Sequence, residues 1–386
     1  MEDFLFLDEQ LSMEERLMRE SAQQWVQSKA MPKIVAAYEA GEFPLDFIAD
    51  LAKLGAFSIT LPEQYGGLGA GAVSYGLVCQ ELEKGDSGLR SFVSVQSSLS
   101  MYPILTYGSE EQKQHWLPKM AQGTVLGCFG LTESDHGSDP AGMQTTAKKV
   151  AGGWRLHGSK MWITNATIAD LAIVWANTEF GIRGFIVEKN FPGFSATEIK
   201  HKLSLRASIT GELSFDDCFI PDSHYLPGTD IGIRAPLGCL TQARYGIAWG
   251  ALGAAQACYD CALDYCLQRQ QFGKAIASFQ LVQKELVEMF TEIVKGQCYN
   301  LQLGRLKEAN RSNYAMVSLG KMNACQQALA IARSARALLG ANGISLEYPV
   351  IRHMANLESV ATYEGTDNIH HLILGKYITG ISAFGG

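Results

Sequence analysis

The chain has 386 residues, of which 47% are hydrophobic and 18% charged, so it can bury a large core and is long enough for two or three packed units. Its net charge is -7, from 32 basic and 39 acidic residues, and no run of Lys or Arg forms the basic patch that nucleic-acid binding needs. These totals favour an ordered globular protein without a nucleic-acid partner.

The N-terminal residues are acidic and lack both the charged n-region of a signal peptide and the Arg-rich character of a transit peptide. We therefore expect a cytoplasmic protein. From about residue 11 to residue 107 apolar residues recur every three or four positions, with breaks at Gly55 and Pro62, which is typical of amphipathic helices. The pattern predicts an N-terminal helical domain over residues 1–123.

Near residue 124 the pattern changes to short apolar runs, such as 125–130, 154–156, 171–175 and 183–187, which are separated by turn residues. Short runs bounded by Gly and Pro are typical of strands. We expect a middle β domain over residues 124–228.

The remainder of the chain returns to long helical patterns, over residues 238–269, 278–308, 314–339 and 347–379. Helices of this length can pack as a four-helix bundle and present an apolar face to other subunits. The Gly- and Ala-rich stretch within the first of them is shorter than the roughly 20 residues that a membrane span needs. The order is therefore α, β, α, an α+β fold class whose C-terminal bundle domain covers residues 229–386.

Several other patterns carry no chemistry. Nine cysteines are scattered through the chain, as in proteins with free buried thiols, and Cys258 and Cys261 form a CxxC pattern without a second pair, so no metal site is predicted. The glycines of residues 67–71 lack the spacing of a phosphate-binding loop. His370 and His371 are adjacent in a helical pattern and cannot face one ligand, which favours ordinary helix residues. No hydrolase, zincin or Walker motif is present.

Three motifs occur in order along the chain: Leu-Thr-Glu-Ser-Asp-His-Gly-Ser-Asp at 131–139, Lys-Met-Trp-Ile-Thr-Asn at 160–165 and Tyr-Glu-Gly-Thr at 363–366. Together they resemble the acyl-CoA dehydrogenase family over the whole chain. Further stretches are similar to its glutaryl-CoA dehydrogenase branch, at 86–91, 94–98, 243–250 and 374–380. The resemblance implies an N-terminal helical domain, a β-barrel-like middle domain and a C-terminal four-helix bundle in a homotetramer. It also implies bound FAD and an electron-transferring flavoprotein as the electron acceptor.

Glu364 is the candidate catalytic base. Removing the α-proton of an acyl-CoA requires a carboxylate whose pKa is raised by desolvation. A lone Glu in a helical pattern is usually a surface residue, but the Tyr-Glu-Gly-Thr motif outweighs that alternative. Gly365 lets the thioester approach the backbone, where the Glu364 N–H polarises its carbonyl, as the resemblance implies.

The resemblance also implies a flavin site made of hydroxyls, backbone N–H groups and one aromatic ring, in which Trp162 packs on the ring. Taken singly, these residues are also compatible with surface turns or a solvated Arg. The residues expected to contact FAD are Phe129, Leu131, Thr132, Gly137, Ser138, Trp162, Ile163, Thr164, Thr366 and Asn368, together with Arg269, Phe272, Gln280, Ala337, Leu338, Gly340 and Ala341, which come from a neighbouring subunit.

Arg90 bears on the substrate. It lies just inside a predicted helix opened by residues 86–88. A cation there is unfavourable to the helix dipole, and a bound anion would account for its presence. With the helix-opening N–H groups, Ser91 and Ser94, it is suited to bind the far carboxylate of a dicarboxylyl thioester. The alternative is a surface ion pair of Arg90 with Glu83 or Asp86. The expected substrate site comprises Glu83, Arg90, Ser91, Ser94, Ser138, Arg244, Tyr363, Gly365 and Phe384.

These expectations combine into oxidative decarboxylation of glutaryl-CoA to crotonyl-CoA and CO2, with Tyr363 favouring CO2 release. Two alternatives remain: a short-chain acyl-CoA dehydrogenase or oxidase for an uncharged acyl group, and a flavin-free binding or assembly protein. Leu89, Ser134 and Asp367-Asn368 depart from the family pattern. Leu89 touches the expected tail region, so it bears on chain length or tail polarity.

Overall fold

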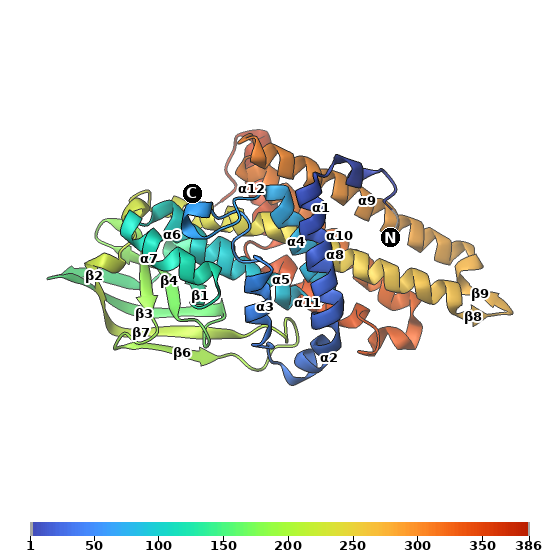
Figure 1. Ribbon diagram of the computed structural model, residues 1–386, viewed down its shortest axis with the longest axis horizontal. Helices are drawn as coiled ribbons and strands as arrows, with labels where there is room; N and C mark the ends of the chain where they lie inside the picture. The colour runs from blue at the N-terminus through green and yellow to red at the C-terminus, as the bar shows by residue number, and fades with distance from the viewer. Residues whose placement is uncertain (1–2, 385–386) are drawn as a thin grey trace.

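The computed structural model describes residues 3–384, and its first third is helical, as the spacing of apolar residues predicts (Figure 1). The helices α1 and α7 each begin with a capping box, in which Ser12 pairs with Glu15 and Ser109 with Gln112. The N-terminal helices are α1 (Met13–Trp25), α2 (Met31–Ala40), α3 (Phe47–Lys53), α4 (Ala72–Gly85), α5 (Ser87–Ser94), α6 (Tyr102–Tyr107) and α7 (Glu110–Ala121).

The short helix α5 lies at the centre of the molecule, and every one of its residues is buried. Asp86 separates it from α4 and caps it, because the Asp86 carboxylate accepts a hydrogen bond from the Gly88 amide at 2.7 Å. A side chain at Gly88 would lie 2.3 Å from the Ala207 carbonyl oxygen, so only glycine allows this close packing. The chain continues from α5 through a π-helical turn, Val95–Met101.

The middle of the chain forms one curled seven-stranded sheet in the order β1-β4-β2-β3-β7-β6, with β5 paired to β4. The runs predicted from sequence overlap β1, β3, β4 and β5. The strands β2, β6 and β7 were not predicted individually, because β2 and β6 are largely exposed or half-buried and β7 interrupts its buried positions with polar ones. The strands are β1 (Gly127–Gly130), β2 (Thr146–Val150), β3 (Gly153–Thr164), β4 (Leu171–Thr178), β5 (Gly181–Glu188), β6 (Phe194–Glu198) and β7 (Thr210–Pro221).

The C-terminal part is again helical. The helix α8 packs against both α4 and α10, and its glycines and alanines permit this close approach. A small hairpin of β8 (Gln270–Gln271) and β9 (Lys274–Ala275) joins α8 to α9 at the end of the molecule remote from the sheet (Figure 1). The helices are α8 (Arg234–Gln268), α9 (Gln280–Glu308), α10 (Tyr314–Leu338), α11 (Val350–Thr362) and α12 (Asp367–Thr379).

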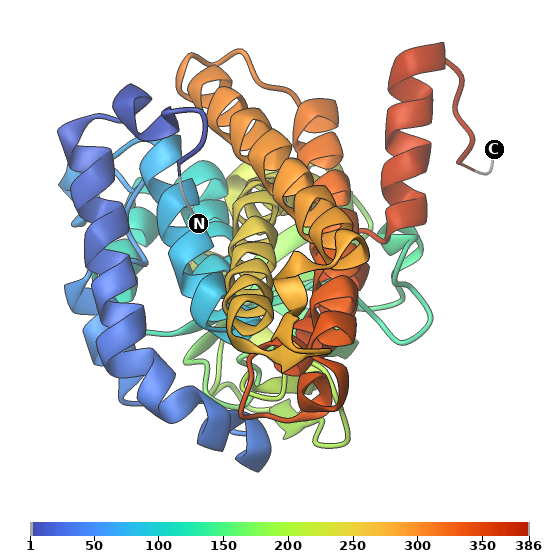
Figure 2. The ribbon, with the colours of Figure 1, turned by 90° about the vertical axis from the view of Figure 1, so that its right-hand side faces the viewer.

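The single helix predicted over residues 347–379 is wrong, because the chain breaks between α11 and α12. Glu364 has φ 54° and Gly365 has φ 100°, values that an α-helix does not allow. Thr366 then caps α12, and its side chain accepts a hydrogen bond from the Ile369 amide at 3.4 Å. Figure 2 shows α12 standing apart from the other helices, in red, beside the C-terminal end of the chain.

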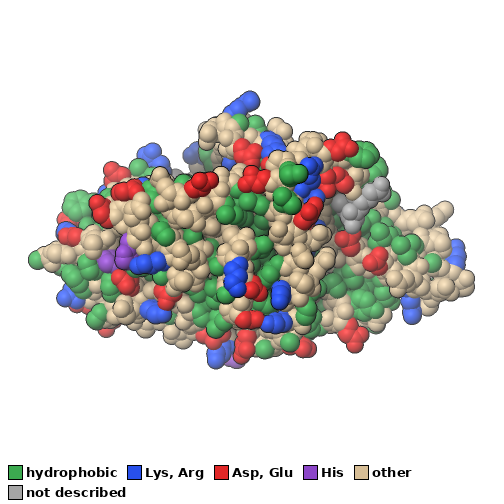
Figure 3. Space-filling view, viewed as in Figure 1, with side chains coloured by type: hydrophobic (Ala, Val, Ile, Leu, Met, Phe, Trp, Pro, Cys, Tyr) green, Lys and Arg blue, Asp and Glu red, His purple; other side chains and the backbone are tan. Residues whose placement is uncertain are grey.

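Within residues 3–384 no helix combines the length and apolarity needed to cross a membrane. All nine cysteines are free thiols, and no cluster of His, Cys, Asp or Glu in the described part of the chain could hold a metal ion. On the face seen in Figure 3, acidic and basic side chains are interspersed. That face therefore presents no large field of one sign.

Candidate active site

Two adjoining hollows meet at Glu364. The smaller, of about 140 Å³, extends to Ser91 and Leu99 of the N-terminal helices. The larger, of about 560 Å³, extends along the sheet to Ser138 and Thr210. The residues that line both hollows are Thr132, Gly137, Trp162, Thr164, Tyr363, Glu364 and Gly365. All three sequence motifs, which are far apart along the chain, thus meet at one place.

An irregularity in β3 presents Trp162 to these hollows. The pairing of β3 with β7 shifts between Lys160 and Ile163, and Trp162 has φ 63°, so its side chain leaves the sheet and is 59% exposed. The Met161 amide donates to the Thr132 carbonyl at 2.9 Å, which joins the first two motifs. An exposed indole between the Thr132 and Thr164 side chains fits a flat ring with polar edges, such as the isoalloxazine of FAD.

A buried ion pair supports the first motif. Lys160, fully buried, donates to the Glu133 carboxylate at 2.8 Å and to the Leu131 carbonyl at 3.1 Å. Glu133 also accepts from the amides of Gln144 and Thr145, at 2.6 and 2.9 Å. Burial alone raises the pKa of Glu133, but these hydrogen bonds outweigh it and lower the pKa to about 2. Both residues lie in the sequence motifs, but neither their pairing nor a role for them was predicted from the sequence.

The Glu364 carboxylate is desolvated. Its Oε2 atom is out of reach of solvent and has no hydrogen-bond partner among the described residues. Burial raises the pKa of Glu364 to about 7, although Arg90, Arg244 and Lys321 act in the opposite direction. A carboxylate with such a pKa is a competent proton acceptor near neutral pH.

Two buried cations hold the backbone that carries Glu364. Arg244, expected at the substrate, donates instead from Nε to the Glu364 carbonyl at 2.6 Å. Lys321 of α10 donates to the carbonyls of Ala361 and Gly365, at 3.1 and 2.8 Å. Sequence reasoning missed Lys321, because nothing in its own helical pattern signals a contact with a turn 40 residues further along the chain.

His370 is not the ordinary helix residue that the sequence suggested. Its ring is buried, and Nδ1 lies 2.6 Å from the Ser318 hydroxyl of α10. A side chain on Gly365 would come within 3.2 Å of His370 Nε2, so the ring packs under the turn. His371 points outward, as adjacent helix positions must.

Arg90 forms a buried contact set rather than a surface ion pair. It is 1% exposed, and its Nε donates to the Glu83 carboxylate at 2.6 Å. A second guanidinium nitrogen donates to the Tyr363 hydroxyl, and the guanidinium carbon lies 5.6 Å from the centre of the Tyr363 ring. Burial alone lowers the pKa of Arg90, but the Glu83 carboxylate holds it above its usual value. Tyr363 lines both hollows and Arg90 neither, so the tyrosine separates the cation from them.

The amides that open α5 do not take part in an anion site. The Gly88 amide is taken by Asp86, whose other oxygen accepts from Arg352 at 2.5 Å and from Asn356 at 2.8 Å. The Asp86 carboxylate therefore satisfies the start of the helix, and Arg352 and Asn356 join it in a buried network between α5 and α11. No local sequence pattern indicates this network.

Ser91 and Ser94 are separated by their places on α5. Ser91 lines the smaller hollow, whereas Ser94 is buried and lines neither hollow. Leu89, expected near the substrate tail, is fully buried in the apolar core, where a side chain at Gly85 would come within 3.2 Å of it. Its departure from the family pattern therefore changes core packing rather than the lining of the hollows.

The remaining expected residues fall into two groups. Phe129, Leu131 and Ile163 line the smaller hollow, and Ser138 and Thr366 line the larger. Asn368 is exposed on α12, and Phe384 lies beyond the end of α12; neither lines a hollow.

The residues expected from a neighbouring subunit lie far from the hollows of their own chain. They lie in and beside the β8–β9 hairpin, at the start of α9 and at the end of α10, and Figure 1 shows the hairpin at the end of the molecule remote from the sheet. Phe272 there is 92% exposed although its ring packs edge-on against Phe279, and so large an exposed area is unusual for a phenylalanine. None of this group lines either hollow: Arg269, Phe272, Gln280, Ala337, Leu338, Gly340 and Ala341.

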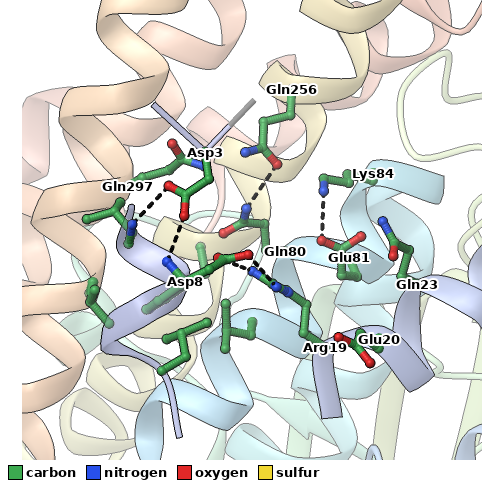
Figure 4. A pocket seen from close by; sticks show the side chains of 15 residues that line it. Asp3, Asp8, Arg19, Glu20, Gln23, Gln80, Glu81, Lys84, Gln256 and Gln297 are labelled. Carbon is green, nitrogen blue, oxygen red and sulfur yellow. Dashed lines mark hydrogen bonds and ion pairs between the residues drawn. The ribbon is translucent and has the colours of Figure 1, made fainter. Parts of the chain in front are cut away.

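A separate cavity of about 290 Å³ lies between the N-terminal segment and helices α1, α4, α8 and α9 (Figure 4). Four of its charged side chains form ion pairs: Arg19 binds Asp8 at 2.5 Å, and Lys84 binds Glu81 at 2.7 Å. No residue expected at the substrate or the flavin lines it. This cavity therefore lies apart from the convergence of motifs at Glu364.

Comparisons with known proteins agree with this geometry. Three family models match in chain order: the acyl-CoA dehydrogenase N-terminal domain over residues 12–124, the middle domain over 128–218 and the C-terminal domain over 230–379. An acyl-CoA dehydrogenase of Bacillus subtilis is 36% identical over 96% of this chain and 99% of its own length.

Solved structures are also similar. A glutaryl-CoA dehydrogenase from Mycobacterium smegmatis has 52% identity and a TM-score of 0.97, with 99% of each chain covered. A glutaryl-CoA dehydrogenase from the same organism in complex with FADH2 has 48% identity, the same TM-score and the same coverage. A chain in the structure described as the electron transferring flavoprotein of Acidaminococcus fermentans has 32% identity and a TM-score of 0.93, covering 96% of this chain and 98% of that one. This chain belongs to the acyl-CoA dehydrogenase family and is an FAD-dependent enzyme.

Proposed function

We propose that the enzyme oxidises glutaryl-CoA and releases CO2 to give crotonyl-CoA. The observation that carries the proposal is a buried, charged Arg90 in contact with the residue next to Glu364. A fully desolvated guanidinium beside a substrate hollow is suited to a carboxylate on the substrate. The similar glutaryl-CoA dehydrogenases support the same substrate.

Glu364 removes the proton from Cα, next to the thioester carbonyl. Glu364 lines the hollows, and its Oε2 atom has no hydrogen-bond partner among residues 3–384, so no donor has to be displaced from that oxygen. FAD, when bound, supplies the acceptor for the hydride that leaves Cβ. The thioester product then has a double bond between Cα and Cβ.

Arg90 binds the far carboxylate of the glutaryl group. Because Tyr363 stands between Arg90 and the hollows, the carboxylate has to replace the tyrosine hydroxyl as an acceptor for the guanidinium. The exchange leaves the buried cation with a partner at each stage, which avoids the large penalty of an unpaired buried charge. Ser91, one residue further along α5, lines the same hollow and can donate its hydroxyl.

Decarboxylation follows from the position of the new double bond. The bond between Cγ and the carboxylate carbon breaks, CO2 leaves, and the electron pair spreads through the double bond into the thioester carbonyl. Glu364, now protonated, returns its proton to Cγ and gives crotonyl-CoA. One carboxyl group thus serves as the acceptor and then the donor of the same proton.

We further propose a homotetramer in which residues 269–280 and 337–341 of one subunit complete the FAD site of another, and an electron-transferring flavoprotein as acceptor. The exposed Phe272 supports the first point, since a partner subunit would cover it. The similarity to a chain from Acidaminococcus fermentans supports the second.

An uncharged short acyl-CoA is the second candidate substrate. Arg90 already has partners in Glu83 and Tyr363, so it can serve as a structural cation without any substrate carboxylate. The family assignment sets aside the flavin-free alternative.

An anaerobic panel of acyl-CoA thioesters tests the proposal. The purified, FAD-loaded enzyme is mixed with glutaryl-CoA and with butyryl-CoA, and flavin absorbance and product masses are followed. Rapid bleaching with glutaryl-CoA and formation of crotonyl-CoA are expected. Bleaching by butyryl-CoA alone would instead establish the uncharged substrate.

A further inference from the structure

We infer that Lys321 is a positioning residue for the catalytic base, because it ties together the backbone on both sides of Glu364. The inference rests on the proposed role of Glu364. Lys321 touches neither hollow, so it acts through the turn that carries the base.

The turn at residues 363–366 cannot hold its own shape. It follows the last residues of α11, whose carbonyl groups have no partner within their helix. Glu364 then takes φ 54° and Gly365 φ 100°, and a non-glycine residue in this region is strained unless its surroundings fix it. Contacts from outside the turn must therefore determine where the Glu364 side chain points.

Lys321 supplies two of these contacts. Its Nζ donates to the carbonyl of Ala361, at the end of α11, and to that of Gly365, just before α12. The two carbonyls lie on either side of Glu364 in sequence, so one ammonium group spans the break between the helices. Arg244 binds the Glu364 carbonyl between them. With its carbonyls held toward these cations, the turn leaves the Glu364 carboxylate facing the hollows.

The surroundings of Lys321 argue against a role in binding substrate. The side chain is fully buried. The charged and titratable groups that face it are Arg244, Cys325, Glu364, Asp367 and His370. An ammonium group at this depth is retained only where hydrogen bonds compensate its lost hydration. The two carbonyls provide that compensation, so ammonium and turn stabilise each other.

Two effects of Lys321 can be separated by experiment. As a nearby cation it favours the ionised form of Glu364, and its removal alone would shift the pH dependence of the reaction. As a positioning residue it fixes the direction of the carboxylate, and its removal lowers the rate even where Glu364 is fully ionised. The rate at high pH therefore distinguishes position from charge.

The test compares Lys321→Met with Lys307→Met in the FAD-loaded enzyme. Lys307 of α9 is half-buried, donates to Gln242 at 2.6 Å and makes none of the hydrogen bonds that hold the turn. Flavin bleaching is measured at saturating thioester across a pH series. For Lys321→Met we expect the high-pH plateau to fall by about 10²-fold, the loss that a displacement of about 1 Å can cause. Lys307→Met is expected to keep the plateau.

Two further readouts do not depend on turnover. Hydrogen exchange at the amides of residues 362–366 is expected to accelerate in Lys321→Met and not in Lys307→Met. A 3-thia acyl-CoA, whose sulfur prevents formation of the double bond, reports proton removal alone through its charge-transfer absorbance. That absorbance is expected to weaken in Lys321→Met while the affinity for the analogue is retained.

An unchanged plateau with only a shifted pH profile would overturn the inference, as would an equal loss in Lys307→Met. If Lys321→Met does not fold, Lys321→Gln, whose amide can reach one carbonyl without a charge, takes its place with the same expected loss. Substantial turnover by Glu364→Gln would refute the proposed base instead. The exchange rates at residues 362–366 would still decide whether Lys321 holds the turn.

Discussion

Arg90 and Tyr363 are 273 positions apart in the sequence, yet the guanidinium of one donates to the hydroxyl of the other. The contact joins the buried cation of α5 to the residue that precedes Glu364. The residue proposed to bind the tail of the substrate thereby contacts the neighbour of the residue proposed to remove its proton. The first prediction tests this relationship.

Tyr363→Phe removes the hydroxyl that competes with a substrate carboxylate for Arg90. We expect a glutaryl thioester to bind more tightly by about 0.5–1.5 kcal/mol, the net value of one hydrogen bond. Butyryl-CoA, which has no carboxylate, should bind as before. Equilibrium titration of both thioesters checks this, and equal changes in the two affinities would show that Arg90 does not meet the carboxylate.

Arg90→Met strands the Glu83 carboxylate in the core and should destabilise the protein by about 3–5 kcal/mol. The double variant Glu83→Gln, Arg90→Met removes both charges and should recover most of that stability, as measured by denaturant unfolding. We nevertheless expect kcat/KM for glutaryl-CoA to stay low in the double variant. Relative to the parent enzyme, the loss corresponds to about 2–5 kcal/mol of transition-state stabilisation. Recovered activity with glutaryl-CoA would make Arg90 a structural cation.

Glu364→Gln should retain FAD and lose at least about 10²-fold in the rate of flavin bleaching. It should also alter stability in a pH-dependent way. Because burial raises the pKa of Glu364 from 4.5 to about 7, the folded state favours the protonated form, and ionisation costs stability as the pH rises through this interval. The full cost, at most about 3 kcal/mol, is present above the folded-state pKa.

The glutamine variant should therefore unfold at a higher temperature than the parent at about pH 8 and at a similar temperature at about pH 4. Calorimetry at the two pH values provides the check. A difference of the same size at both would mean that the carboxylate is not desolvated.

The stability contributed by Glu133 depends on pH in the opposite direction. Its pKa is lowered from 4.5 to about 2, so the ionised form stabilises the fold above pH 4.5, and this contribution disappears as the pH falls toward 2. Glu133→Gln should cost about 3 kcal/mol at about pH 7 and progressively less in acid. Because Glu133 and Lys160 support the loop with Thr132 and Ser138, the variant should also bind FAD more weakly, which reconstitution of the apoprotein measures.

Much of the site was accessible from the sequence, since the three motifs contain all the residues that line both hollows. The family, the α+β fold class and the FAD dependence are confirmed. The break at Glu364 was missed, because the apolar helical spacing continues across it and only one glycine marks it. A positive φ at a glutamate depends on distant contacts, here with Arg244 and Lys321, and leaves no local signal.

The contacts around Arg90 and the start of α5 were predicted only in part, for a related physical reason. A cation near a helix start suggests a ligand, but the sequence could not indicate that Asp86 caps the helix or that Arg352 and Asn356 hold Asp86 from α11. These contacts cross more than 260 residues. Helical periodicity likewise identified Leu89 and Ser94 as helix residues without revealing which way each one faces.

The break between α11 and α12 also determines how the enzyme tolerates changes in length. Residues 363–366 join α11 to α12 outside both helices, with positive φ at Glu364 and Gly365, so inserting or deleting one residue there would redirect the carboxylate relative to α11 and reorient α12. Substitutions at the exposed positions of α12 leave the geometry of this connection unchanged. Activity therefore depends on the length of this connection as well as on its residues. Insertions and deletions there should be far more damaging than substitutions in the helix that follows.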